Sequence, residues 1–441
     1  VDVVTQIGLS CDYGLVACVS DSKSSLSSQV QLAKNNIHIN TSIIFKRFEW
    51  IQRNRNSDNL NSFKAAIKFY DPLLNHVVDK LHDKVVVRTK SLKKKSNKDK
   101  KNNWSYWSHG DLIIGSYHGK SGEPGINLEK PKDIFTTGIT FGVDKKNSKN
   151  NYSGYAIRYA DGKSKFAESG HETTMDTLSL NYYFITPFKN SGYTNTVVGL
   201  SSLKYDLKTG GVVTGQRNGK QLFTSIDFRN DNEYGRFNLT PSLKIKHALT
   251  SLSDFTEFMT NASSSATNVI YGKQTFVTGD VATGFLFNSD PIKKTDITIS
   301  HNGGLEFVYD YSPDITFEYT YAGDSNAEYY KVENYSQKNI RANYGFEEIY
   351  KNNFTFSANY ERLQHLDSNK FSHTDSFFIK VGHIKEEDYE FALSLDALQD
   401  YKVRSHYSTT LGKFDLKIGS NYNFMSQAPE YGAMLEISNK H

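Results

Sequence analysis

The stretch NFTFSANYE, residues 353–361, alternates apolar and polar side chains with a period of two. Successive side chains of a β-strand point to opposite faces of a sheet, so this pattern predicts a strand with one apolar and one polar face. The same alternation recurs between residue 104 and the end of the chain. Clear examples are ITFEYTY (315–321), YEFALSL (389–395) and FDLKIGSNYNF (414–424).

Turn-forming clusters such as SKNN (148–151) and LDSNK (366–370) separate these runs, and short connections roughly alternate with long polar ones. The pattern predicts about sixteen strands. Candidate starts lie near residues 104, 136, 151, 174, 193, 219, 236, 272, 294, 314, 334, 353, 371, 388, 400, 413 and 430. Because these are seventeen positions and a bacterial barrel closed by antiparallel pairing needs an even number, at least one of them is not a wall strand.

The composition suits a membrane barrel. Aromatic residues make up 13% of the chain, with 28 Tyr and 28 Phe, whereas hydrophobic residues make up 37%. A barrel wall needs apolar side chains on one face and favours aromatic girdles at both interfaces. No run approaches the ~18–20 apolar residues of a transmembrane helix. The sequence therefore predicts an all-β fold, an outer-membrane antiparallel barrel of 12 or more strands, over a soluble sandwich or propeller.

The first part of the chain differs from the rest. Spaced apolar positions predict a helix over residues 24–53, and two further candidates are DNLNSFKAAIKFY (58–70) and PLLNHVVDKLHDKVV (72–86). A lysine-rich stretch at residues 93–101 marks the boundary. We expect three segments: the end of a passenger or linker (1–23), a helical linker or pore plug (24–103) and the barrel (104–441).

The charges and cysteines add weaker signals. The net charge of +4 is small, and the lysine cluster reads as a solvated linker or as a contact for anionic lipid headgroups, with no nucleic acid partner expected. Cys11 and Cys18, in CDYGLVAC, can close a small disulfide loop in an oxidising compartment or remain free thiols. Two thiols without neighbouring histidines supply too few ligands for a metal.

Several segments resemble the C-terminal β-domain of the autotransporters. WSYWSHGDLIIGSY (104–117) is similar to the first strand of that family. FTTGITFGVD (135–144), which contains the spacing GxxxGxD, resembles a following strand, as do YSGYAIRYADGKS (152–164) and TMDTLSLNYYF (174–184). The resemblance covers residues 104–290 well and the remainder more loosely. Upstream, FEWIQRNRNSDNLNSF (48–63) resembles the linker of autotransporters from AT-rich marine alphaproteobacteria.

This resemblance implies a translocator of type V secretion. It implies a barrel of typically twelve strands, a linker helix in the lumen and an N-terminal passenger at the bacterial cell surface. The expected partners are outer-membrane lipid, the chain's own passenger, the barrel-assembly machinery and periplasmic chaperones. Two features depart from the family: residues 104–441 are more than such a barrel needs, and the chain ends in ISNKH where the family ends in an aromatic residue.

The search for chemistry gives one weak candidate. Some autotransporters cut their own linker through an asparagine side chain, and Asn35 and Asn36 in AKNNIHIN form an Asn-Asn pair in the predicted helix. Three further Asn-Asn pairs begin at residues 102, 150 and 352. No nucleophile motif, phosphate loop or metal-spaced histidine cluster occurs, so we expect no enzyme activity and no cofactor. The alternatives to a translocator are a porin-like channel with an N-terminal plug and an outer-membrane adhesin or receptor.

Overall fold

The structure is a computed structural model. It describes residues 19–53, 104–117, 132–148, 151–166, 171–188, 192–209, 213–259, 268–322, 326–334, 336–350, 354–367, 373–383, 389–396, 402–411, 414–423 and 430–439. Cys11, Cys18, the two candidate helices within residues 58–86 and the lysine-rich stretch lie outside these ranges. The disulfide therefore stays a prediction, as does the division of the chain at residues 23 and 103.

One helix precedes a long series of strands. The helix is α2 (Val19–Arg53), which includes the predicted segment 24–53. The strands are β1 (Trp104–Tyr117), β2 (Lys132–Ser148), β3 (Asn151–Phe166), β4 (Glu172–Phe188), β5 (Gly192–Thr209), β6 (Val213–Asn230), β7 (Asn232–Tyr234), β8 (Phe237–Leu252), β9 (Phe255–Met259), β10 (Val269–Tyr271), β11 (Gln274–Ser289), β12 (Ile292–Lys293), β13 (Ile297–Asp310), β14 (Ile315–Tyr321), β15 (Glu328–Val332), β16 (Lys338–Tyr350), β17 (Phe354–His365), β18 (His373–His383), β19 (Tyr389–Asp396), β20 (Lys402–Leu411), β21 (Phe414–Asn423) and β22 (Glu430–Asn439).

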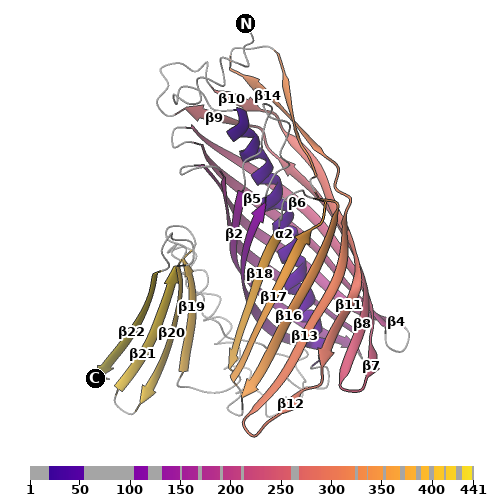
Figure 1. Cartoon of the computed structure of the whole chain (residues 1–441), viewed down its shortest axis with the longest axis vertical. Coiled ribbons are helices and arrows are strands. Elements are labelled where there is room, and N and C mark those ends of the chain that lie inside the picture. Colours follow the sequence, from indigo (N-terminus) through magenta and orange to yellow (C-terminus); the bar gives the residue numbers. More distant parts are fainter. Residues whose placement is uncertain are drawn as a thin grey trace.

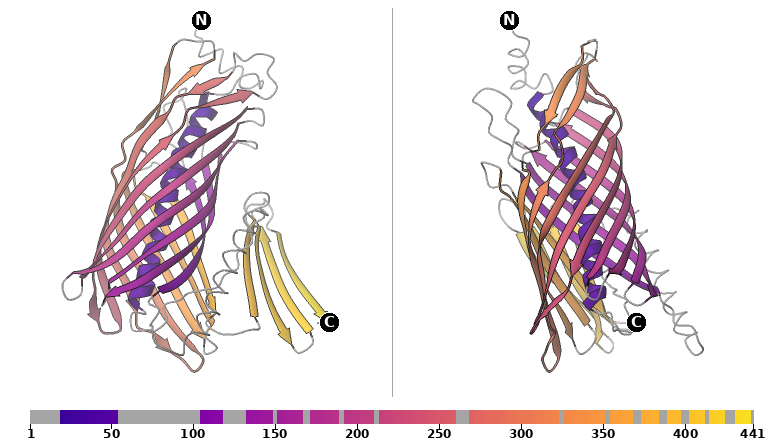
Figure 2. Two further views of the ribbon diagram at one scale, coloured as in Figure 1. Left: turned by 180° about the vertical axis from the view of Figure 1, so that it is seen from behind. Right: turned by 90° about the vertical axis from the view of Figure 1, so that its right-hand side faces the viewer.

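Twelve of the described strands pair into a closed antiparallel ring. The order is β1, β2, β3, β4, β5, β6, β8, β11, β13, β16, β17 and β18, and β18 pairs back onto β1. The strands tilt around α2, which runs along the lumen (Figures 1 and 2). The predicted antiparallel barrel of 12 or more strands is confirmed.

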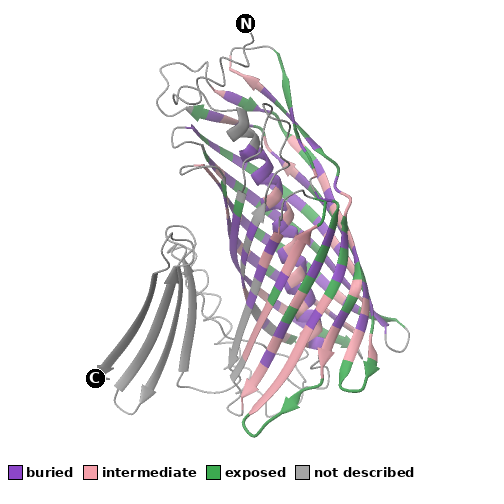
Figure 3. Cartoon of the chain, viewed as in Figure 1, coloured by how far each residue is buried: buried purple, intermediate pink, exposed green. Residues whose placement is uncertain are grey.

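The wall strands place polar side chains inside and apolar ones outside. In β6, buried residues such as Arg217 and Gln221 alternate with outward residues such as Leu222. Figure 3 shows this alternation over the ring. The exposed large apolar side chains include Tyr155, Leu178, Leu180, Tyr182, Leu200, Leu222, Leu243, Phe285, Leu305 and Phe307. Because a water-soluble protein buries its apolar face, this arrangement is that of a wall in contact with lipid.

Four short strands extend the barrel at one end. β9 pairs with β6 at Val213–Met259, β10 pairs with both β9 and β14, and β14 pairs with β15. We call β9, β10, β14 and β15 the collar; they lie at the end where α2 begins (Figure 1). The strand expected near residue 314 is therefore β14, a collar strand outside the ring. This resolves the odd number of candidate strands.

The last four strands form a second antiparallel sheet, in the order β19-β20-β21-β22. No pairing joins the described strands of this sheet to those of the ring. The sequence alone assigned residues up to 441 to one barrel, whereas the ring is complete at His383. The alternating pattern found these strands but does not specify which neighbour each one pairs with.

Helix α2 is buried on nearly all sides. Leu32, Ile39 and Ile43 have no exposed surface, and neither do polar residues such as Gln29 and Thr41. A helix enclosed by a polar lumen needs polar side chains wherever it meets polar wall residues, which explains the imperfect apolar spacing in the sequence. No helix among the residues that the structure describes is both long and apolar enough to cross a membrane.

Candidate functional site: the helix in the barrel lumen

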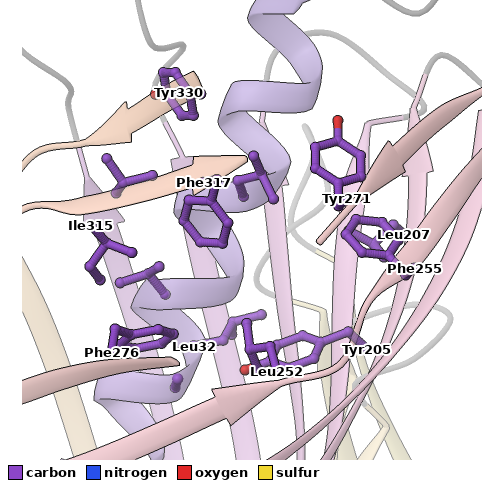
Figure 4. Packing of buried hydrophobic residues seen from close by; sticks show 14 of the residues in the cluster. Leu32, Tyr205, Leu207, Leu252, Phe255, Tyr271, Phe276, Ile315, Phe317 and Tyr330 are labelled. Atoms are coloured by element: carbon purple, nitrogen blue, oxygen red, sulfur yellow. The ribbon is translucent and has the colours of Figure 1, made fainter. Parts of the chain in front are cut away.

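The start of α2 lies in an apolar cluster at the collar end. Leu26, Val30, Leu32 and Ala33 of the helix belong to this cluster. Phe255 and Tyr271 of the collar stack with ring centroids 4.5 Å apart. Figure 4 shows residues of this cluster. Its partners from wall and collar include Tyr205, Leu207, Leu252, Phe255, Tyr271, Phe276, Ile315, Phe317 and Tyr330. The collar therefore contributes aromatic side chains to the cluster that includes the start of the helix.

Arg217 ties this cluster to the wall. Its guanidinium carbon lies 4.8 Å from the ring centroid of Phe255 and 5.7 Å from that of Phe317, distances at which a cation is attracted to an aromatic face. Its Nη2 donates to the carbonyl oxygen of Gly272 at 3.0 Å, and its Nη1 donates to Oε1 of Gln29 on the helix at 3.2 Å. One wall side chain thus joins helix and collar.

Tyr319 supplies a polar contact inside the collar itself. Its hydroxyl donates to Oε2 of Glu328 at 2.6 Å, across the β14–β15 pair. Burial, followed by the neighbouring Glu328 carboxylate, raises the pKa of the Tyr319 phenol. The hydroxyl therefore stays protonated and remains a donor over the whole physiological range of pH.

An amide network holds the middle of the helix. Nδ2 of Asn36 donates to Oγ of Ser201 at 3.1 Å and to Oε1 of Gln221 at 3.0 Å. Its Oδ1 accepts from Nδ2 of Asn40 at 2.9 Å and from Nη1 of Arg158 at 3.5 Å. All four hydrogen bonds are buried. Asn36 is therefore an anchor between the helix and three wall strands.

Among the residues that the structure describes, three ion pairs join α2 to the wall. Arg47 donates to Asp144 through Nε at 2.7 Å and Nη2 at 2.9 Å, a two-bond contact with both side chains at most 3% exposed. Such paired hydrogen bonds give orientation as well as energy. The other two ion pairs are Lys34–Asp310 at 3.0 Å and Arg229–Glu49 at 2.9 Å, and a ring nitrogen of His38 forms a hydrogen bond with Oε1 of Glu361 at 2.7 Å.

Further buried charges of the wall form ion pairs with one another. Glu306 accepts from Lys244 at 3.0 Å through Oε1 and from Arg341 at 2.9 Å through Oε2. Arg158 donates to Asp111 at 2.6 Å, again between buried side chains. Because each of these charges has a close partner of opposite sign, the lumen tolerates them next to the helix.

The glycines of the GxxxGxD stretch make room for these contacts. A Cβ atom at Gly138 would lie 2.4 Å from Nη2 of Arg158, and one at Gly142 would lie 2.2 Å from the ring of Trp107. The stretch then ends at Asp144, the partner of Arg47. The motif thus has a physical basis: two flat inner surfaces for large side chains, followed by the acid that binds the helix.

A second group of aromatic side chains, Trp107, Tyr183 and Phe48, lies near the end of α2. Nε1 of Trp107 donates to the hydroxyl of Tyr183 at 2.7 Å, and the rings of Phe48 and Tyr183 meet edge to face at 5.4 Å. The Tyr183 hydroxyl also donates to Asp144 at 3.2 Å. The aromatic group and the Arg47–Asp144 pair are therefore one connected cluster.

The structure shows the surroundings of the predicted site residues Asn35 and Asn36. Asn35 and Asn36 lie inside the lumen and are buried, as their place in the predicted helix implied. The sequence did not identify Arg47, Asp144, Arg158 or Gln221, since partners far apart in sequence carry no local signal. The GxxxGxD spacing was the one clue to Asp144. Among the described residues, no group of three or more His, Cys, Asp and Glu side chains is placed to hold a metal ion.

A closed barrel that is apolar outside, polar inside and filled by a helix is an outer-membrane barrel of the plugged type. A profile of the autotransporter beta-domain family matches residues 116–361, more than half of the chain. The chain belongs to the autotransporter β-domain family. It is a translocator domain of the outer membrane, with its passenger side at the cell surface.

Solved structures with a similar fold include three autotransporter domains. The translocator domain of NalP from Neisseria meningitidis is 14% identical, with 70% of this chain and 98% of that chain covered at a TM-score of 0.47. The β-domain of BrkA from Bordetella is 12% identical, with 64% and 99% covered at 0.43. The transport unit of AIDA-I from Escherichia coli is 13% identical, with 66% and 92% covered at 0.40. A sequence search of curated proteins gives no significant match.

Proposed function

We propose that the barrel exports a passenger attached ahead of Val1 and then keeps α2 in the lumen as a plug that ties the passenger to the membrane. The observation that carries this proposal is the set of contacts between α2 and the wall. An apolar cluster includes the start of the helix, and among the described residues three ion pairs and the His38–Glu361 hydrogen bond hold its middle and end.

The direction of the helix supports export toward the collar. Val19 lies at the collar end, so a segment ahead of α2 leaves the lumen there (Figure 1). The opposite rim carries short connections, such as those between Ser148 and Asn151 and between Phe188 and Gly192. Short turns are typical of the periplasmic rim, and longer loops are typical of the outer rim.

The proposed mechanism requires no cofactor and no catalytic step. An unfolded segment passes the wet lumen, and folding of the passenger outside biases the direction of transport. Insertion of the barrel would use periplasmic chaperones and the barrel-assembly machinery. Asn36 acts in this proposal as an anchor, because attack of its amide nitrogen on the backbone would first require release of both Ser201 and Gln221.

Surface display of a tag tests the proposal. An epitope placed directly before Val1 should be accessible to antibody and to added protease on intact cells, whereas an epitope after His441 should be accessible after the outer membrane is permeabilised. A porin-like channel with an internal plug predicts that the first epitope is also protected in intact cells, and this result would contradict export.

A further inference from the structure

The seam between β1 and β18 is shorter than the pairings on either side of it. β18 residues His373–Ile379 pair with β1 residues Gly110–Ser116, which gives seven residue pairs. By contrast, β1 pairs with β2 along fourteen residues and β18 pairs with β17 along eleven. The β1–β18 pairing ends at Gly110 and Ile379, whereas β1 begins at Trp104 and β18 ends at His383.

The β1–β18 pairing stops toward the end of the lumen where α2 ends. Trp107 of β1 belongs to the same apolar cluster as Phe48 of α2. A β-barrel in a membrane requires closed pairing because hydrocarbon supplies no hydrogen-bond partners for open edges. The β1–β18 seam, with seven residue pairs, is the shortest pairing among the described strands of the ring.

The strands of the second sheet have the lengths of barrel-wall strands. Its strands β19, β20, β21 and β22 contain 8, 10, 10 and 10 residues, close to the ~9–11 that a tilted membrane strand needs. Their sequences alternate apolar and polar residues as those of the ring do. Within the described strands, β19 and β22 each pair on one side. Exposed sheet edges of this kind favour pairing with another strand.

Connectivity and direction allow this sheet to fit the seam. Residues 384–388 connect β18 to β19, a length typical of a hairpin between antiparallel neighbours. Twelve ring strands plus four keep the even number that antiparallel closure requires. Since directions alternate along the chain, β22 would run antiparallel to β1 and could close the larger ring.

We propose that β19–β22 enter the wall between β18 and β1 and convert the twelve-stranded ring into a sixteen-stranded one. In this second state β18 pairs with β19 and β22 pairs with β1. This inference rests on the proposed outer-membrane translocator function. Barrel diameter grows roughly linearly with strand number, so the larger ring offers space beside α2 for a second extended segment. The twelve-stranded ring, filled by α2, is then the plugged state.

A competition between cysteine pairs tests the proposal in the full chain. In a Cys11→Ser/Cys18→Ser background, Ile113→Cys on β1 is combined with Ser376→Cys on β18 and with one of Met434→Cys, Leu435→Cys or Glu436→Cys on β22. Ile113 and Ser376 are register partners in the twelve-stranded ring, at the separation that a disulfide needs. After oxidation in outer membranes, the two products enclose different lengths of chain and separate on non-reducing gels.

A matched control reports on the intact wall. Leu178→Cys with Ser202→Cys places the pair at register partners on the outward face of β4 and β5, away from α2, and both states of the ring keep this pairing. We expect the control to form its disulfide and a β1–β22 product to form at one or more of the three positions. If the control forms but residue 113 crosslinks to residue 376 alone at every position, the sixteen-stranded state is wrong while the translocator function stands. Loss of the control crosslink together with loss of surface display would instead contradict the proposed function.

Discussion

The two ends of α2 share apolar packing against the wall but differ in their charged contacts. At the collar, the helix contacts aliphatic and aromatic side chains such as Leu252 and Phe317. Toward its end, the helix lies in a second apolar cluster, which includes Phe48, and buried ion pairs also hold it, with Arg47–Asp144 as the pair that makes two hydrogen bonds. Apolar packing is tolerant of small changes of angle, whereas paired hydrogen bonds fix one register. We infer that the Arg47–Asp144 pair sets the register of the helix and that the collar packs around its start.

Breaking the Arg47–Asp144 pair should have the largest effect. Arg47→Ala leaves the Asp144 carboxylate buried without its main partner, and removal of one partner of a buried pair destabilises by about 3–5 kcal/mol. Urea unfolding of the refolded barrel in lipid vesicles measures this loss. The double variant Arg47→Ala/Asp144→Asn should recover part of the stability because it removes the orphaned charge. No recovery in the double variant would mean that the pair contributes mainly through packing.

Opening the apolar cluster at the collar should have a comparable but more local effect. Phe317→Ala removes a side chain that is 1% exposed at the centre of the collar, and such truncations destabilise by about 3–5 kcal/mol in a cooperative core. Since the collar lies outside the ring, we expect faster proteolysis of the collar with little change in unfolding of the wall. Limited proteolysis followed by mass spectrometry locates the cuts. Equal destabilisation of the wall would show that collar and ring unfold together.

Replacing Asn36 should cause the next largest loss of stability. Asn36→Ala removes the donors to Ser201 and Gln221 and leaves buried polar groups unsatisfied, which destabilises by about 1–3 kcal/mol. The same position tests self-cleavage. If the chain cuts itself at Asn36, the native protein gives a shortened fragment on denaturing gels and Asn36→Asp abolishes it. A single full-length band from native protein would support the anchoring role.

An exposed pair provides the smallest expected effect. Lys331 and Asp314 lie 2.6 Å apart on the collar, and both side chains are more than a third exposed. Surface ion pairs contribute little because water screens both charges. Lys331→Ala should therefore leave unfolding and proteolysis unchanged within error. A clear loss of collar stability would show that electrostatics at the mouth matter more than the apolar cluster does.

The sequence predicts the wall better than it predicts the lumen. Alternation over NFTFSANYE and similar stretches identifies strands because one face of each meets lipid and the other meets water or α2. The same rule could not separate β14 of the collar from a wall strand, since both alternate. It also could not show that β18 pairs back onto β1 while β19–β22 form a second sheet. Pairing between strands far apart in sequence depends on ring closure.

The contacts of α2 were largely beyond prediction for a related reason. Asn36 was singled out for its neighbour in sequence, yet its four partners come from β3, β5, β6 and α2 itself. Arg47 carried no local signal. Asp144 belongs to the GxxxGxD spacing. The role of its second glycine depends on the three-dimensional structure, because Gly142 leaves room for the Trp107 ring.

The most direct test of the plug is the conductance of single barrels in planar bilayers. The full chain is compared with a variant that begins at Trp104, after both are shown to migrate as folded barrels on unheated gels. Because α2 fills the lumen, we expect the full chain to be nearly closed and the shortened variant to open a stable pore. Equal, large conductance from both would contradict a helix-filled lumen.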